Sequence, residues 1–114
     1  MLEALCIAKG VSGAENTAAK TASEMLGRFM SVSVDALGSV TGRKEGKGPH
    51  ILLDAHIDQI GLVVTAIDED GFLKFSKCGG ADRRVLSAAE VTVHGKKDVF
   101  GVVTSTPPHL AKPE

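Results

Sequence analysis

The most constraining feature of the sequence is the run LLDAHIDQIGLVV, residues 52–64, in which three polar residues interrupt apolar ones. The apolar residues predict a buried strand, and side chains two positions apart on a strand project from the same face. Asp54, His56 and Asp58 are therefore expected to share one face. Because an unpaired charge is costly inside a protein, these side chains need solvent at the strand end, a hydrogen-bond network or a metal ion.

The chemistry of these three residues leaves two interpretations open. A histidine between carboxylates suits a metal site, since a metal-bound imidazole commonly donates its other ring N–H to a carboxylate. Asp58, or alternatively Asp54, is the candidate for that carboxylate. The spacing alone also suits an ordinary polar cluster at a strand end, because catalytic zinc takes about three protein ligands and one His-x-Asp motif supplies a single one.

The other potential metal ligands are scattered along the chain. His50, His94 and His109 lack close ligand spacing and are interpreted as structural. Cys6 and Cys78 are far apart, which favours buried, reduced thiols in a cytoplasmic protein over a disulfide. With a net charge of −1 over 114 residues and no basic stripe, nucleic acid is not an expected partner. No apolar segment is long enough to predict a membrane span.

The remaining pattern predicts one helix followed by short strands. The sequence SGAE at 12–15 is a capping box, from which an amphipathic helix is expected to run to about Met30. Strands are expected at 31–34, 39–43, 50–55, 60–67 and 72–76, with Gly71 at a positive φ in the last turn. The later apolar pieces VLS, EVTVHG and VFGVVTS predict a small all-β unit. This change near residue 70 predicts two parts, 1–69 and 70–114.

Several motifs in this order resemble the di-metal, tetrahedron-forming aminopeptidases. These include glutamyl and deblocking aminopeptidases and proteins long labelled endoglucanase or cellulase M. The matching stretches are GVSGAE (10–15), PHILLDAHIDQIG (49–61), VTAIDEDGFLKFSKCGG (64–80), RVL (84–86), VTVHGKK (91–97) and GVVTSTPPHL (101–110). The resemblance implies an α/β fold in which 1–69 is the N-terminal part of a zinc-peptidase-like sandwich. Residues 70–114 would begin a small β-barrel used for dimerisation and for assembly into a dodecamer.

The resemblance also implies a site. His56 corresponds to a ligand of one of two divalent metal ions (Zn, Co or Mn), and Asp58 to the residue that supports that ligand from behind. Asp54 corresponds to no family ligand. The family's other ligands and its general-base Glu lie in a remaining C-terminal portion that has no counterpart here. The implied function is therefore the N-terminal fragment of a metal-dependent aminopeptidase that removes N-terminal residues from peptides, inactive by itself.

Two other functions remain as alternatives. The chain could be a non-catalytic assembly or interaction module that buries its exposed sheet face against another copy. It could also be a small zinc-binding protein that gathers Cys6, His56, Cys78 or other His residues. In each case the expected location is the cytoplasm.

Overall fold

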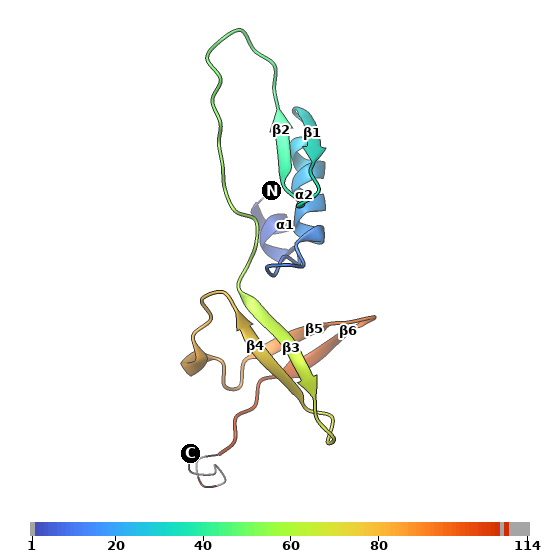
Figure 1. Cartoon of the computed structure of the whole chain (residues 1–114), viewed down its shortest axis with the longest axis vertical. Helices are drawn as coiled ribbons and strands as arrows, with labels where there is room; N and C mark the ends of the chain where they lie inside the picture. Colours follow the sequence, from blue (N-terminus) through green and yellow to red (C-terminus); the bar gives the residue numbers. More distant parts are fainter. Residues whose placement is uncertain (1, 108, 110–114) are drawn as a thin grey trace. The chain divides into compact units, whose positions relative to one another are not determined.

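The computed structural model describes residues 2–107 and 109 (Figure 1). Contacts within the chain define two compact units, Met1–Gly80 and Ala81–Glu114. The elements in order are α1 (Leu2–Ile7), α2 (Asn16–Leu26), β1 (Ser31–Val34), β2 (Val40–Arg43), β3 (Gly61–Ile67), β4 (Leu73–Cys78), the 3-10 helix η1 (Arg83–Val85), β5 (Glu90–His94) and β6 (Asp98–Val102). The described strands form three antiparallel pairs, β1–β2, β3–β4 and β5–β6, and the fold is of the α/β class. Within the described residues, neither α-helix has the length or apolar character that a bilayer crossing needs.

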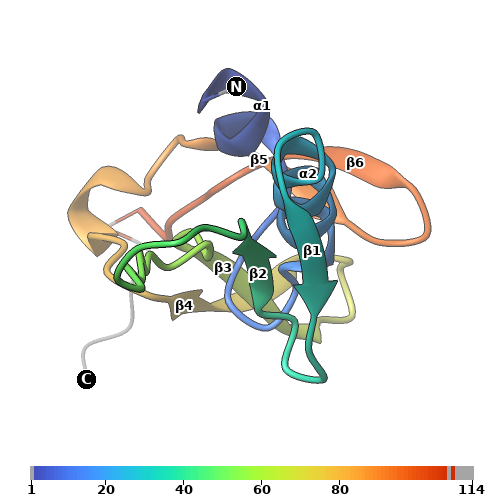
Figure 2. The ribbon, with the colours of Figure 1, turned by 90° about the horizontal axis from the view of Figure 1, so that it is seen from above.

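In the first unit, α2 packs along the β1–β2 hairpin (Figures 1 and 2). Ala18 on α2 is 1% exposed, which shows that the apolar face of the helix is used for packing. The hairpin turn is built by Asp35, whose Oδ1 accepts hydrogen bonds from the backbone N–H groups of Leu37 and Ser39, both at 2.9 Å. Gly38 completes the turn at φ +88°. The two strands predicted here are confirmed.

The start of α2 differs from the capping-box prediction. The helix begins at Asn16 with Glu15 at its cap position, and no side chain caps it. Instead, Glu15 Oε1 accepts a hydrogen bond from the Gly13 N–H at 2.6 Å. The regular helix ends at Leu26 rather than near Met30, and a further irregular turn follows, in which the Met30 N–H donates to the Leu26 carbonyl at 3.1 Å. Ser12 is therefore available for another interaction.

The strand predicted at 50–55 is wrong, because this segment has no regular secondary structure. Ile51, Leu52 and Leu53 are 82%, 87% and 90% exposed. A strand needs a neighbour that accepts and donates backbone hydrogen bonds, and the described residues provide none for this segment. An apolar sequence alone cannot satisfy that requirement.

The β3–β4 hairpin confirms the strands predicted at 60–67 and 72–76, although β4 extends to Cys78. Gly71 is at φ +85° as predicted, and its N–H donates to the Asp68 carbonyl at 3.0 Å. The two strands pair with each other, and the compact units of the structure separate after Gly80. The division of the chain into a catalytic part, 1–69, and a dimerisation part, 70–114, stays a prediction.

The second unit contains η1 and the β5–β6 hairpin. Asp82 caps η1 by accepting a hydrogen bond from the Arg84 N–H at 2.9 Å, and its carboxylate pairs with the Arg84 guanidinium at 2.6 Å. That short-range bonding holds the VLS region in a helical turn rather than in the expected strand. Val103, which is buried, follows β6 and exchanges backbone hydrogen bonds with Ala88 and Ala89, each at 2.9 Å.

Candidate metal-binding site

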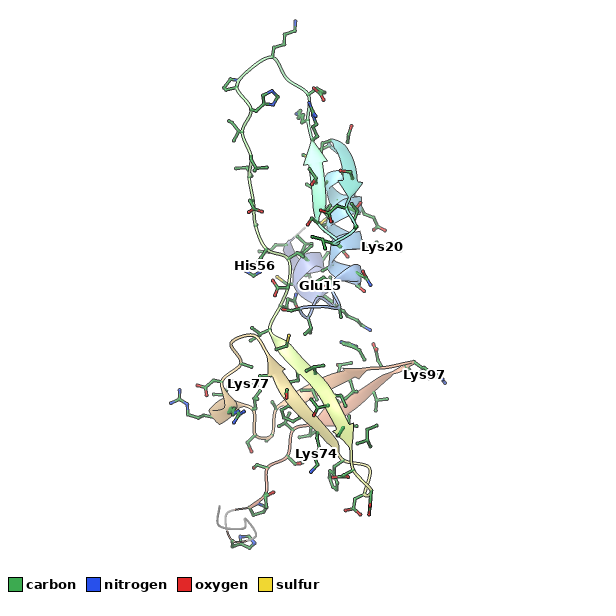
Figure 3. All side chains as sticks on the ribbon, in the orientation of Figure 1. Glu15, Lys20, His56, Lys74, Lys77 and Lys97 are labelled. Carbon is green, nitrogen blue, oxygen red and sulfur yellow. The ribbon has the colours of Figure 1, made fainter. Side chains whose placement is uncertain are left out.

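His56 lies on the segment that leads into β3 (Figure 3), and its side chain contacts that of Asp58 directly. The distance from His56 Nδ1 to Asp58 Oδ1 is 3.0 Å, and the Asp58 carbonyl oxygen lies 3.2 Å from the same nitrogen. The His56 side chain is 86% exposed. When Nδ1 donates to a carboxylate, Nε2 keeps its lone pair, which is the form of imidazole that binds a metal ion.

Asp58 is in turn held by Ser12. The Ser12 hydroxyl donates to Asp58 Oδ2 at 2.5 Å, so each carboxylate oxygen accepts one side-chain hydrogen bond. The hydrogen bond from Ser12, followed by that from His56, lowers the pKa of the Asp58 carboxyl. Asp58 is consequently an anion at neutral pH, able to orient the imidazole and to increase its basicity.

A tight turn presents Ser12 to this carboxylate. The Ala14 N–H donates to the Val11 carbonyl at 2.7 Å, and Gly13 adopts φ +87°, which a residue with a side chain rarely does. Glu15 braces the turn by accepting the Gly13 N–H. The residues that were interpreted as a capping box therefore form a turn whose serine hydroxyl bonds to Asp58 and does not cap the helix.

Backbone hydrogen bonding places that turn beside Asp58. Val11 and Gln59 form an isolated parallel bridge, and the Gln59 N–H donates to the Gly10 carbonyl at 2.6 Å. The Gln59 side-chain amide also donates to the Leu5 carbonyl at 3.4 Å. The segments around residues 11 and 59 are thus joined through their main chains, and Ser12 and Asp58 are the side chains next to that junction.

The structure does not bring Asp54 into this site. Asp54 was expected on the same face as His56 only because a strand was expected, and it lies instead in the exposed irregular segment. Across the described residues, 2–107 and 109, no three His, Cys, Asp or Glu side chains are grouped as a metal would require. Cys6 and Cys78 are both free thiols, and Cys6 is exposed rather than buried as predicted. His56 and Asp58 therefore form at most a partial metal site.

Sequence reasoning missed Ser12 as part of the site. Its capping-box pattern offered a sufficient local explanation, and nothing in the local pattern joins residue 12 to residue 58. Only the resemblance could have linked Ser12 to Asp58, because GVSGAE and AHIDQIG are both among the motifs that match the family. Two motifs that occur together in one family are expected to belong to the same structural unit.

Comparison with known proteins identifies the class of protein. Residues 38–114 match the M42 glutamyl aminopeptidase family. The protein FrvX of Escherichia coli (strain K12) is 37% identical over 112 residues, which cover 96% of this chain and 32% of FrvX. The chain therefore falls within a group of peptide hydrolases. More specifically, it belongs to the M42 glutamyl aminopeptidase family, which confirms the resemblance found in the sequence.

Solved structures agree with this assignment. A TET aminopeptidase from the marine sediment archaeon Thaumarchaeota archaeon SCGC AB-539-E09 matches 98% of this chain with a TM-score of 0.87 and 35% identity, over 32% of its own length. The TET1 peptidase of Pyrococcus horikoshii, which can assemble into a tetrahedron or a large octahedral shell, matches 96% with a TM-score of 0.81 and 35% identity, over 34% of its length. The chain thus spans about a third of the length of these relatives.

Proposed function

We propose that this chain contributes His56 and Asp58 to the metal centre of a metal-dependent aminopeptidase. The observation that carries the proposal is the 3.0 Å contact between His56 Nδ1 and Asp58 Oδ1 on an exposed imidazole. With Nδ1 engaged by a carboxylate, Nε2 is the ring nitrogen left to bind a metal ion. His56 would hold one of two divalent ions, and Asp58 would orient His56 and raise its basicity.

The chemistry of the donor set fits such a metal only in part. Divalent ions bound in this way polarise a peptide carbonyl and lower the pKa of a bound water. Imidazole with carboxylates accepts Zn, Co or Mn, so His56 does not choose among them. Asp58 would hold the imidazole in the orientation that leaves Nε2 for the ion, and the substrate would be a peptide with a free N-terminus.

We infer that the chain alone is inactive. One imidazole cannot hold two metal ions, and the absence of a general base typically costs two to four orders of magnitude in rate. The other ligands and the base would come from the remaining C-terminal portion of the family fold. The exposure of Ile51, Leu52 and Leu53 supports this, because three such apolar side chains shortly before His56 in the sequence are left for another segment to cover.

Assembly into a homo-oligomer is part of the proposal, with residues 70–114 contributing to a β-barrel dimerisation domain. On β6, Val99, Phe100 and Val102 are 58%, 68% and 49% exposed, and such apolar side chains favour burial against another strand or subunit. The same exposure supports the alternative of a non-catalytic assembly module in the cytoplasm. Dependence of activity on His56 distinguishes the two functions.

The test replaces the matching part of the Thaumarchaeota TET aminopeptidase with residues 2–107 of this chain. The chimera, supplied with zinc, cobalt or manganese, is expected to release N-terminal residues from peptides, and His56→Ala is expected to abolish that release. His50→Ala is the matched control and should leave it unchanged. A folded chimera that keeps full activity after His56→Ala, or that is inactive with every metal, would contradict the proposed role.

A further inference from the structure

We propose that Ser12 is a positioning residue that fixes the Asp58 carboxylate and, through it, the orientation and tautomer of His56. This inference rests on the proposed function for its importance, but the geometry that carries it lies within this chain. Ser12 Oγ donates to Asp58 Oδ2, and His56 Nδ1 lies against Asp58 Oδ1. The three side chains therefore form one hydrogen-bonded series that ends at the imidazole.

The need for a second donor follows from the flexibility of an aspartate side chain. The terminal torsion of Asp is broad, so a single hydrogen bond at Oδ1 leaves the carboxylate free to rotate. A hydroxyl that donates to Oδ2 holds the second carboxylate oxygen and so restricts that rotation. Because the Asp58 side chain is 41% exposed, packing alone does not immobilise it. Ser12 supplies the missing restraint.

Ser12 itself is held by contacts on both sides of its backbone. The Val11–Ala14 turn fixes its conformation, and the bridge between Val11 and Gln59 fixes its distance from Asp58. The Cys78 thiol also donates to the Ser12 carbonyl oxygen at 3.8 Å. The hydroxyl is therefore preorganised toward the carboxylate, and no large movement is needed to form the bond.

The ordinary role for a serine at this position is to cap a helix, and the structure gives the hydroxyl a different partner. Helix α2 begins four residues later, at Asn16, and receives no side-chain cap. The effect of removing Ser12 should consequently be seen at His56 rather than in the helix. This separates a positioning role from a purely structural one.

The experiment measures the ring ¹⁵N chemical shifts of His56 in the full, metal-free chain at a pH where the imidazole is neutral. In the wild type we expect the Nδ1–H tautomer to dominate. Ser12→Ala should move these chemical shifts toward the tautomer mixture of a free imidazole, and Ser12→Thr, which keeps the hydroxyl, should restore the wild-type pattern. Thr21→Ala is the matched control, because the Thr21 hydroxyl donates within α2 to the Thr17 carbonyl at 2.9 Å.

Ser12→Cys provides a second variant of nearly the same size with a weak donor, and it should resemble Ser12→Ala. Unchanged His56 chemical shifts in either folded variant would overturn the inference, as would an equal change in Thr21→Ala. In the chimera, Ser12→Ala should weaken zinc binding about tenfold, with rescue by Ser12→Thr. If His56→Ala leaves the chimera active, the proposed function fails, whereas the tautomer measurement still decides the role of Ser12.

Discussion

The backbone N–H of Gln59 donates to the carbonyl oxygen of Gly10 at 2.6 Å, and this bond joins two motifs that are far apart in the sequence. Gly10 leads directly into the turn that carries Ser12, and Gln59 directly follows the segment that carries His56 and Asp58. The candidate site is therefore organised by main-chain pairing between an N-terminal loop and the segment that leads into β3. Changes that disturb this junction should affect the site even where they touch none of its side chains.

Gly61→Ala should destabilise the chain through this junction. A Cβ at residue 61 would lie 2.5 Å from Val11 Cγ2 and 2.9 Å from Val11 Cγ1. Valine is stiff about χ1, so the contact can be relieved only by moving the backbone bridge. We expect a loss of about 1–3 kcal/mol in the free energy of unfolding, measured by urea denaturation.

Two variants control this prediction. Gly46→Ala introduces the same methyl group where nothing lies within 4 Å of the new Cβ, and it should be close to neutral. Val11→Ala in the Gly61→Ala background removes the clashing methyl groups and should recover part of the lost stability. A Gly61→Ala chain as stable as Gly46→Ala would show that the junction is looser than the structure indicates.

Asp58→Asn should weaken metal binding in the chimera, whereas Asp54→Asn should not. The amide introduced at position 58 keeps the size of the side chain but removes the charge that orients His56 and increases its basicity. Loss of such a supporting carboxylate typically lowers metal affinity or activity about 10–100-fold. Zinc competition with a chromophoric chelator measures the affinity. Equal losses in the two variants would indicate a general effect of negative charge near residues 54–58 rather than the contact with His56.

Asp35 should make the stability of the β1–β2 hairpin depend on pH. The Ser39 N–H, and more weakly the Leu37 N–H, stabilise the carboxylate and lower the pKa of Asp35 in the folded chain. Its contribution is therefore present above the unfolded pKa, about 3.9, and is lost as the pH falls through the lower folded value. Asp35→Asn keeps one acceptor oxygen for the two backbone N–H groups and removes the charge.

We expect Asp35→Asn to lower the melting temperature at pH 7 and to match the wild type near pH 2. Thermal unfolding followed by circular dichroism across this range measures the difference. Asp70→Asn, at the tip of the β3–β4 hairpin, is the matched control for the loss of one negative charge. If the difference in melting temperature between wild type and Asp35→Asn grew as the pH fell, the pKa of Asp35 would not be lowered in the folded chain.

Local signals predicted the elements that depend on neighbouring residues. Alternation and turn residues located both β1–β2 and β3–β4, and Gly71 was placed correctly because a hairpin bulge needs a positive φ. The spacing predicted that Asp58, or alternatively Asp54, would contact His56, and the structure shows the contact with Asp58, although the reason given, a shared strand face, was wrong. The contact arises from an irregular segment in which Asp54 takes no part.

The features that the sequence did not predict depend on contacts with residues far away in the chain. The segment 50–55 has the composition of a buried strand, but composition cannot show whether a neighbouring strand is present. Ser12 fits a helix cap by its spacing, but its hydroxyl bonds to Asp58 because backbone pairing brings the two together. The break between the compact units follows the β3–β4 pairing rather than the change in composition near residue 70.

The exposed side chains at 51–53 lead to a prediction about self-association. Leu52 and Leu53 are 87% and 90% exposed and adjacent, whereas Leu37 is 94% exposed at a hairpin turn. A contiguous apolar patch drives association, while a single exposed leucine is tolerated at most surfaces. Leu52→Lys with Leu53→Lys should shift the isolated chain toward the monomer in sedimentation velocity, and Leu37→Lys should leave its distribution unchanged. The chimera should lose activity with the double substitution if the rest of the enzyme covers this segment, since lysines there would prevent the contact. A double variant that associates like the wild type and remains fully active in the chimera would mean that the segment stays uncovered in the complete protein.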